Sequence, residues 1–227
     1  MTERVRPRSL DHVALWVAER EPLAALLCDH LGMHVIEETE SFTLVGVHAK
    51  LGKLTLFEAE PPRSPGALER VALRVRDLDD VVGRLPVEVE RDAHGVVFEA
   101  PEGLRLGLVE AEGVDFDLDH VVLRLPDPTA AAGALAAMGF DRHDGHVAVA
   151  DRRVRLVEGR GEDGGRPLLN HLAVLVESAH EVQDQATARG FEIDDVKDAP
   201  NTFAVFLRGP AGVRIEYVEH KPGFALV

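Results

Sequence analysis

The sequence is poor in cysteine and in aromatic residues. Cys28 is the one cysteine among 227 residues, which excludes an intramolecular disulfide. Its Ala/Leu-rich surroundings predict a small buried residue rather than a reactive thiol. Aromatic residues make up 5% of the chain, so a core must be built mainly from valine, leucine and alanine. No apolar run is long enough for a signal peptide or a membrane span, and we therefore expect a cytoplasmic protein.

Positive charge is also scarce. The chain has 25 lysine and arginine residues against 40 aspartate and glutamate residues, a formal net charge of −15. Nucleic acids are bound mainly through clustered basic side chains, so this balance argues against nucleic acid and against an anionic membrane surface. A small-molecule substrate remains the expected partner, because one pocket can differ in charge from the whole molecule. Homo-oligomerisation stays open.

What the sequence does contain is a fourfold repeat. Four similar segments start at positions 10, 68, 118 and 169, so their spacings are 58, 50 and 51 residues. Such even spacing indicates one supersecondary unit repeated along the chain. The segments read Leu10-Asp-His-Val-Ala-Leu-Trp-Val17, Leu68-Glu-Arg-Val-Ala-Leu-Arg-Val75, Leu118-Asp-His-Val-Val-Leu-Arg-Leu125 and Leu169-Asn-His-Leu-Ala-Val-Leu-Val176.

Each segment alternates with a period of two, which is typical of a β-strand. One side of each strand is wholly apolar, as with Val13, Leu15 and Val17 in the first copy. The other side is partly polar and carries His12, with His120 at the same place in the third copy and His171 in the fourth. This pattern suits a sheet that is covered by a helix on one face and borders a cavity on the other. The histidines then face the cavity.

A helical stretch and three short strands follow each first strand. Ser178 is a suitable N-cap and Gly190 a suitable C-terminal stop for the helix of the fourth copy. The unit is therefore β-α-β-β-β. The expected helices are 19–30, 78–85, 130–138 and 179–189, and the expected later strands of the fourth copy are 191–194, 202–207 and 213–219.

This arrangement resembles the vicinal oxygen chelate superfamily, which includes glyoxalase I, bleomycin-binding proteins and type I extradiol dioxygenases. The resemblance covers roughly residues 8–220 and implies an α+β fold, in which βαβββ modules pair into cupped, incomplete β-barrels with helices outside. The chain looks most like the two-domain extradiol dioxygenases. By that likeness, residues 1–112 form an N-terminal module pair and residues 113–227 a C-terminal pair with the metal site.

Three residues match the metal ligands of those dioxygenases. His120 and His171 hold equivalent positions in copies three and four. Aligning the turns Pro101-Glu-Gly103 and Pro210-Ala-Gly212 places Glu216 at the last-strand position from which the superfamily takes its carboxylate. Imidazole and carboxylate suit a divalent first-row metal, with Fe(II) the favoured ion and Mn(II) or Zn(II) the alternatives.

The N-terminal module pair lacks a comparable set. His12 is present, but Arg70 stands where the second histidine would be and Gly107 aligns with Glu216. We therefore expect no complete metal site in residues 1–112.

The resemblance favours a dioxygenase that cleaves a catechol-like ring, with Arg124, Phe206 and Arg214 lining the substrate site. Two acid–base residues of such enzymes are replaced here, because Phe206 stands at the place of a tyrosine and Lys197 at the place of a histidine. A metal-dependent isomerase, lyase or glyoxalase-like enzyme is one alternative. A metal-free binding protein of the bleomycin type is another.

Overall fold

The computed structural model describes residues 6–61, 63–161 and 165–226, and within them each copy of the repeat folds as β-α-β-β-β. The first copy comprises β1 (Ser9–Val17), α1 (Arg20–His30), β2 (His34–Glu38), β3 (Phe42–Gly46) and β4 (Lys53–Glu58). The second comprises β6 (Leu68–Val75), α2 (Leu78–Val82), β7 (Glu90–Asp92), β8 (Gly95–Ala100) and β9 (Leu104–Glu110).

The C-terminal copies repeat this order. The third comprises β10 (Leu118–Leu125), α3 (Pro128–Ala137), β11 (Asp141–His143), β12 (His146–Val149) and β13 (Arg152–Glu158). The fourth comprises β15 (Leu169–Leu175), α4 (Ala179–Arg189), β16 (Ile193–Asp198), β17 (Thr202–Arg208) and β18 (Arg214–His220). Two short strands, β5 (Arg63–Ser64) and β14 (Arg166–Pro167), pair in parallel between the copies.

The caps predicted for the last helix are present. Ser178 accepts a hydrogen bond from the backbone N–H of Glu181, and Gly190 ends the helix in the left-handed conformation at φ 71°. The predicted range 179–189 is the observed one, while α2 ends three residues earlier than expected. The α+β fold with cupped sheets is thereby confirmed.

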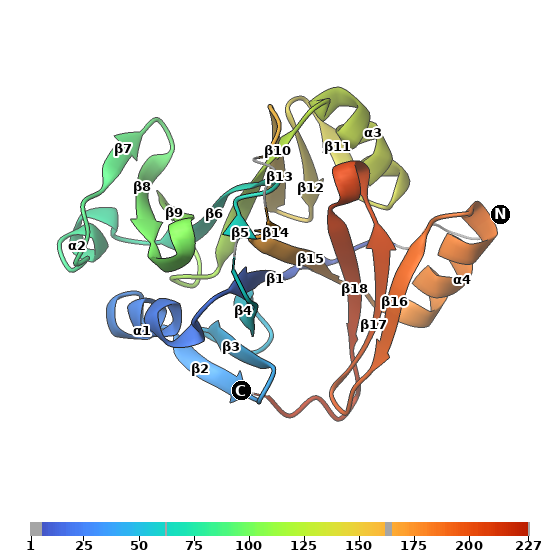
Figure 1. Cartoon of the computed structure of the whole chain (residues 1–227), viewed down its shortest axis with the longest axis horizontal. Helices are drawn as coiled ribbons and strands as arrows, with labels where there is room; N and C mark the ends of the chain where they lie inside the picture. Colours follow the sequence, from blue (N-terminus) through green and yellow to red (C-terminus); the bar gives the residue numbers. More distant parts are fainter. Residues whose placement is uncertain (1–5, 62, 162–164, 227) are drawn as a thin grey trace.

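The copies pair in a different order from the one expected from the sequence. One eight-stranded sheet has the order β16-β17-β18-β15-β1-β4-β3-β2 and joins the fourth copy to the first. We call it the first sheet. The second sheet, β11-β12-β13-β10-β6-β9-β8-β7, joins the third copy to the second (Figure 1). Each sheet thus takes one copy from each side of residue 112, so the expected pairing of copies three and four is not what the structure shows.

A pair of β-bulges marks the centre of each sheet. In the antiparallel pair of β1 and β15, the register shifts between Leu10 and His12 and again opposite Asn170. The pair of β10 and β6 shifts at the corresponding places, between Leu118 and His120 and opposite Glu69. Since a bulge re-aims the side chains beside it, these positions direct the residue that precedes each histidine toward the imidazole ring.

The apolar side of each first strand packs under the helices. Val13, Leu15 and Val17 are fully buried, as are Val121 and Leu123 in the third copy. Figure 1 shows the four helices on the outside of the sheets. The opposite, partly polar faces form the two concave surfaces, which we call the first cup and the second cup after their sheets.

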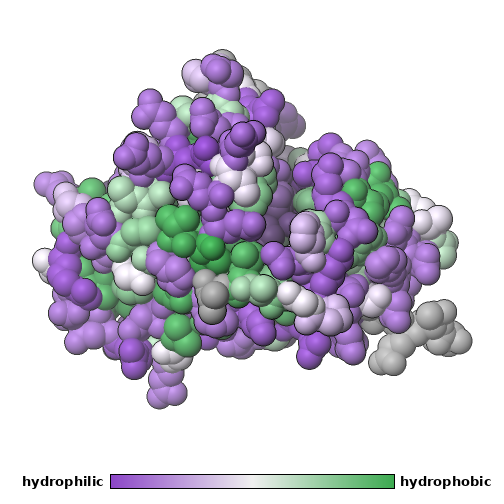
Figure 2. Space-filling model, turned by 90° about the horizontal axis from the view of Figure 1, so that it is seen from below, coloured by the Kyte–Doolittle hydropathy of each residue, from purple (hydrophilic) through white to green (hydrophobic). Residues whose placement is uncertain are grey.

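Throughout the described part of the chain, every helix is too short or too polar to cross a membrane. Figure 2 shows hydrophobic residues gathered on one part of the face seen from below, with hydrophilic residues around them. Val35 on the edge strand β2 is 44% exposed.

Candidate metal centre

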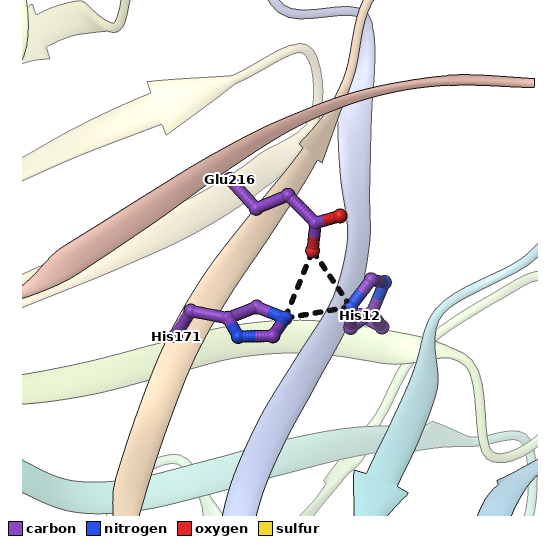
Figure 3. Close-up of side chains that lie close together, drawn as sticks. All are labelled: His12, His171 and Glu216. Atoms are coloured by element: carbon purple, nitrogen blue, oxygen red, sulfur yellow. Dashed lines mark hydrogen bonds and ion pairs between the residues drawn. The ribbon is translucent and has the colours of Figure 1, made fainter. Parts of the chain in front are cut away.

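Three potential ligands converge in the first cup. His12 on β1, His171 on β15 and Glu216 on β18 come from three neighbouring strands of one sheet (Figure 3). The Nε2 atoms of the two histidines are 3.0 Å apart, and Glu216 Oε2 lies 3.1 Å from His12 Nε2 and 2.8 Å from His171 Nε2.

The strand register explains why these side chains meet. Ala14 pairs with His171, and His12 pairs with Ala173, so the two histidines stand diagonally across the antiparallel centre of the sheet. Ala173 pairs in turn with Glu216 on β18. Diagonal neighbours on one face are within reach of long side chains.

Both imidazole rings are held by the residue that precedes them. His12 Nδ1 lies 2.8 Å from Asp11 Oδ1, and His171 Nδ1 lies 3.0 Å from Asn170 Oδ1. An oxygen acceptor at Nδ1 keeps the proton there and leaves the Nε2 lone pair free for a metal. The bulges therefore orient both rings as ligands.

The donor spacing fits an octahedral ion. With metal–ligand bonds of ~2.1 Å, adjacent donors of an octahedron are about 3.0 Å apart, whereas those of a tetrahedron are about 3.4 Å apart. The three observed separations match adjacent octahedral positions. Two histidines and one carboxylate on one octahedral face leave the remaining positions open to other ligands.

The electrostatics of the cluster also favour a bound cation. Burial opposes a charge on His12, but the carboxylates of Glu216 and Asp11 together raise its pKa to about 9. Burial keeps the pKa of His171 below its usual value. Burial likewise opposes ionisation of Glu216, yet the neighbouring histidines hold its pKa well below the usual range. The metal-free cluster is therefore held together by one proton on His12, which a divalent ion would replace.

Buried ion pairs and hydrogen bonds hold Asp11 in place. Lys53 Nζ lies 2.9 Å from Asp11 Oδ1 and also donates to the backbone oxygen of Ala49. His220 Nε2 lies 3.0 Å from Asp11 Oδ2. Burial disfavours the Asp11 carboxylate, but Lys53 and the histidines lower its pKa well below the usual value. Asp11 thus stays ionised and holds His12 firmly.

Aromatic side chains and one arginine surround the cluster. The ring of Phe206 meets His171 edge-on at 5.2 Å, and Phe57 lies between His171 and Trp16. The guanidinium of Arg214 lies 4.0 Å above the Phe206 ring. A cavity of about 590 Å³ adjoins this wall, and its lining includes Trp16, Asn170, Arg214, Arg208 and Arg124. The cavity is large enough for a small aromatic molecule.

The structure brings together two of the three predicted ligands. His171 and Glu216 lie in the cluster, whereas His120 lies on β10 of the second sheet and does not reach it. His12 holds the place assigned to His120, because the first copy, rather than the third, pairs with the fourth. The signal for His12 was present in the sequence, since Leu-Asp-His occurs in both copies one and three.

The other predicted residues are placed as follows. Phe206 and Arg214 lie beside His171, and Arg124 lines the cavity from the third copy. Lys197 sits on β16 with its side chain largely exposed and forms an ion pair with Asp195. Cys28 is half-buried and unpaired, and burial raises the pKa of its thiol.

Comparison with known proteins agrees with this architecture. Residues 9–103 match the model of the Glyoxalase/Bleomycin resistance protein/Dioxygenase superfamily. The fold is that of the vicinal oxygen chelate superfamily. The resemblance inferred from the repeat is thereby confirmed. No curated protein sequence matches the chain significantly.

Solved structures with the vicinal oxygen chelate fold superpose on nearly the whole chain. A candidate dioxygenase from Bacillus subtilis is 18% identical with a TM-score of 0.79, covering 97% of this chain and 88% of that one. Glyoxalase I from Zea mays is 16% identical with a TM-score of 0.73, covering 93% and 92%. The cppA protein from Streptococcus pneumoniae is 16% identical with a TM-score of 0.63, covering 95% and 100%. Identities this low establish the shared fold alone.

Proposed function

We propose that this chain is a metal-dependent enzyme of the vicinal oxygen chelate type that cleaves the ring of a catechol-like substrate with dioxygen. His12, His171 and Glu216 hold the metal, with Fe(II) the favoured ion. The observation that carries the proposal is the mutual spacing of their donor atoms, 2.8–3.1 Å. A bound divalent ion would lower the pKa of a coordinated hydroxyl and hold two oxygen ligands side by side.

Among the residues that the structure describes, no fourth potential ligand joins the cluster, and this separates the proposal from a glyoxalase-like one. Thr55 on β4 pairs with Ala14, as Glu216 pairs with Ala173, so Thr55 is the counterpart of Glu216 in the first copy. A threonine hydroxyl is a much poorer ligand than a carboxylate for a divalent metal. Three strong ligands leave room for both a chelating substrate and dioxygen.

The chain's own residues would position the substrate. Trp16, Phe57 and Phe206 offer apolar and aromatic surface to a planar ring. Arg214 stands over the same ring of Phe206, and ion pairs with Asp194 and Asp195 hold its guanidinium there. His171 and Glu216 are buried and His12 is half-buried, so little water reaches the cluster.

A metal-dependent isomerase or lyase is the second candidate. Phe206 has no hydroxyl where related dioxygenases have a tyrosine, and Lys197 is engaged in an ion pair with Asp195. A reaction on a vicinal-oxygen compound that proceeds without these proton donors would explain both replacements. Oxygen consumption separates the two reactions.

Metal analysis of matched variants tests the site. After anaerobic loading with Fe(II), wild type and His120→Ala should each retain about one ion per chain, whereas His12→Ala should retain almost none. Metal lost from His120→Ala and kept by His12→Ala would overturn the assignment. Thr55→Val is the control within the cup and should keep its metal.

Activity assays then decide the reaction. Oxygen uptake with a panel of catechols, abolished by a chelator and by Glu216→Gln, is the expected result. Metal-dependent turnover without oxygen uptake would favour the isomerase or lyase. Tight ligand binding that survives metal removal would instead identify a binding protein of the bleomycin type.

A further inference from the structure

The second cup repeats the geometry of the metal centre with different side chains. Register places His120 where the first cup has His12, because each pairs with an alanine across the central strands. Arg70 takes the place of His171, since Val122 pairs with Arg70 as Ala14 pairs with His171. The two remaining counterparts are Gly107 for Glu216 and Arg155 for Thr55.

His120 is oriented like a ligand but has nothing to bind. Its Nδ1 lies 2.7 Å from Asp119 Oδ1, and Asp119 is itself held by Arg74 at 3.0 Å. The side chain is 3% exposed, and no described residue forms a hydrogen bond with its Nε2 atom. A buried polar atom without a protein partner is uncommon, so His120 Nε2 is a candidate contact for a bound group.

Three arginines share this face of the sheet with His120. Arg70 and Arg155 flank Val122 on its two sides in one row of the sheet. Arg153 pairs with His120 itself, and its guanidinium lies 3.7 Å from Asp119. The row is therefore rich in guanidinium groups that face the same concave surface.

The arginines differ in how far neighbouring carboxylates neutralise their charge. Arg70 donates to Asp92 at 2.8 Å, and its side chain lies against Gly107, where an added Cβ would be 3.1 Å from Arg70 Cδ. Arg155 is half-buried, and no ion pair or hydrogen bond joins it to another residue in the described ranges. The guanidinium of Arg155 is therefore available to an anion, whereas that of Arg70 is already partly neutralised.

We propose that the second cup binds a small oxyanion that carries a hydroxyl group. Arg155 and Arg70 hold its charged oxygens by charge-assisted hydrogen bonds, and its hydroxyl donates to the free Nε2 lone pair of His120. The same four positions that suit a cation in the first cup carry no carboxylate here, and two of them are arginines. A divalent metal would be repelled at this place. Carboxylate and phosphate groups share the chemistry that the two arginine forks recognise.

Calorimetric titration of the full chain tests this proposal with inorganic phosphate and citrate as separate probes. We expect saturable binding of at least one probe, and the stronger of the two identifies the anion class. Arg155→Gln and His120→Gln should each weaken that binding about tenfold or more, as expected for loss of a charge-assisted contact. Arg142→Gln, which changes an exposed arginine on β11 of the same sheet, should leave it within about twofold.

Two further measurements separate this proposal from the proposed metal centre and from loss of folding. Glu216→Gln should lose metal in the first cup and bind the anion as wild type does, so failure of one proposal is distinguishable from failure of the other. Thermal unfolding of each variant without probe shows whether it is folded, and Arg155→Lys serves as a second, charge-retaining variant with intermediate affinity. Absence of saturable binding to both probes, or equal binding by wild type and both folded glutamine variants, would overturn the proposal.

Discussion

At the scale of single residues, the recurring device is a histidine held by the residue before it. Asp11, Asp119 and Asn170 each place an oxygen within 3.0 Å of the following imidazole Nδ1. This pair of an oxygen-bearing residue and the following histidine occurs in different surroundings. His12 meets His171 and Glu216, whereas His120 has an arginine, Arg70, at the position that corresponds to His171, so the residues across the sheet decide what each imidazole can bind.

Asp11→Asn tests the orienting role in the metal centre. The amide is a weaker acceptor and cannot stabilise charge on His12, so metal affinity should fall about 10- to 100-fold. Competition with a chromogenic chelator measures the change. Asp119→Asn is the matched control and should leave metal affinity unchanged; an equal loss in both variants would contradict the assignment of the centre to the first cup.

The metal-free cluster should make stability depend on pH. His12 has a folded-state pKa of about 9, above the 6.5 of an exposed histidine, so its protonation favours the folded state. This contribution is complete below pH 6.5 and is lost as the pH rises through 9. Denaturant unfolding of chelator-treated protein should therefore show a falling free energy of unfolding across that window.

His12→Gln provides the comparison, because it cannot titrate and should flatten the curve between pH 6.5 and 9. His171, whose pKa is lowered, acts in the opposite sense and below pH 6.5. A wild-type curve as flat as that of His12→Gln would contradict the proton assignment.

At the scale of elements, local sequence signals explain most helices and strands. Capping residues mark both ends of α4, and period-two alternation predicted all four first strands. The bulges were not predicted, because a bulge arises from how two strands pair rather than from the residues of one strand. Their effect is local but functional, since they aim Asp11 and Asn170 at the ligands.

Ser178→Ala tests the capping of α4. Removing the hydroxyl leaves the N–H of Glu181 without its acceptor, so the free energy of unfolding should fall by about 1 kcal/mol. Chemical denaturation measures it, and Ser178→Asp should restore most of the loss. No change in the alanine variant would show that solvent replaces the cap.

At the scale of the whole molecule, buried polar contacts join the two sheets. Asp117, just before β10, accepts a hydrogen bond from the backbone N–H of Gly52 in the first copy at 2.7 Å. An added Cβ on Gly52 would lie 2.5 Å from Leu118, so only glycine allows this approach. Tyr217 on β18 donates to the backbone oxygen of Met138 at the end of α3.

Tyr217→Phe tests this contact between β18 and the end of α3. The carbonyl of Met138 would lose a buried donor, so stability should fall by about 1–2 kcal/mol. Metal content should stay at the wild-type level, because Tyr217 and Glu216 point to opposite faces of β18. Chemical denaturation and metal analysis on the same preparation check both statements, and a loss of metal would show that this contact also positions the ligand.

The repeat, the βαβββ unit, the cup-facing histidines and the place of His171 and Glu216 in the cluster were all predictable, because each depends on periodicity or alignment within the chain. The choice between His12 and His120 was not. Both follow the same Leu-Asp-His motif, so no local property distinguishes them. Only the pairing of β1 with β15, which brings together residues 159 positions apart, places His12 beside His171 and Glu216. Strand pairing depends on how the copies close against one another, and that is decided by tertiary packing.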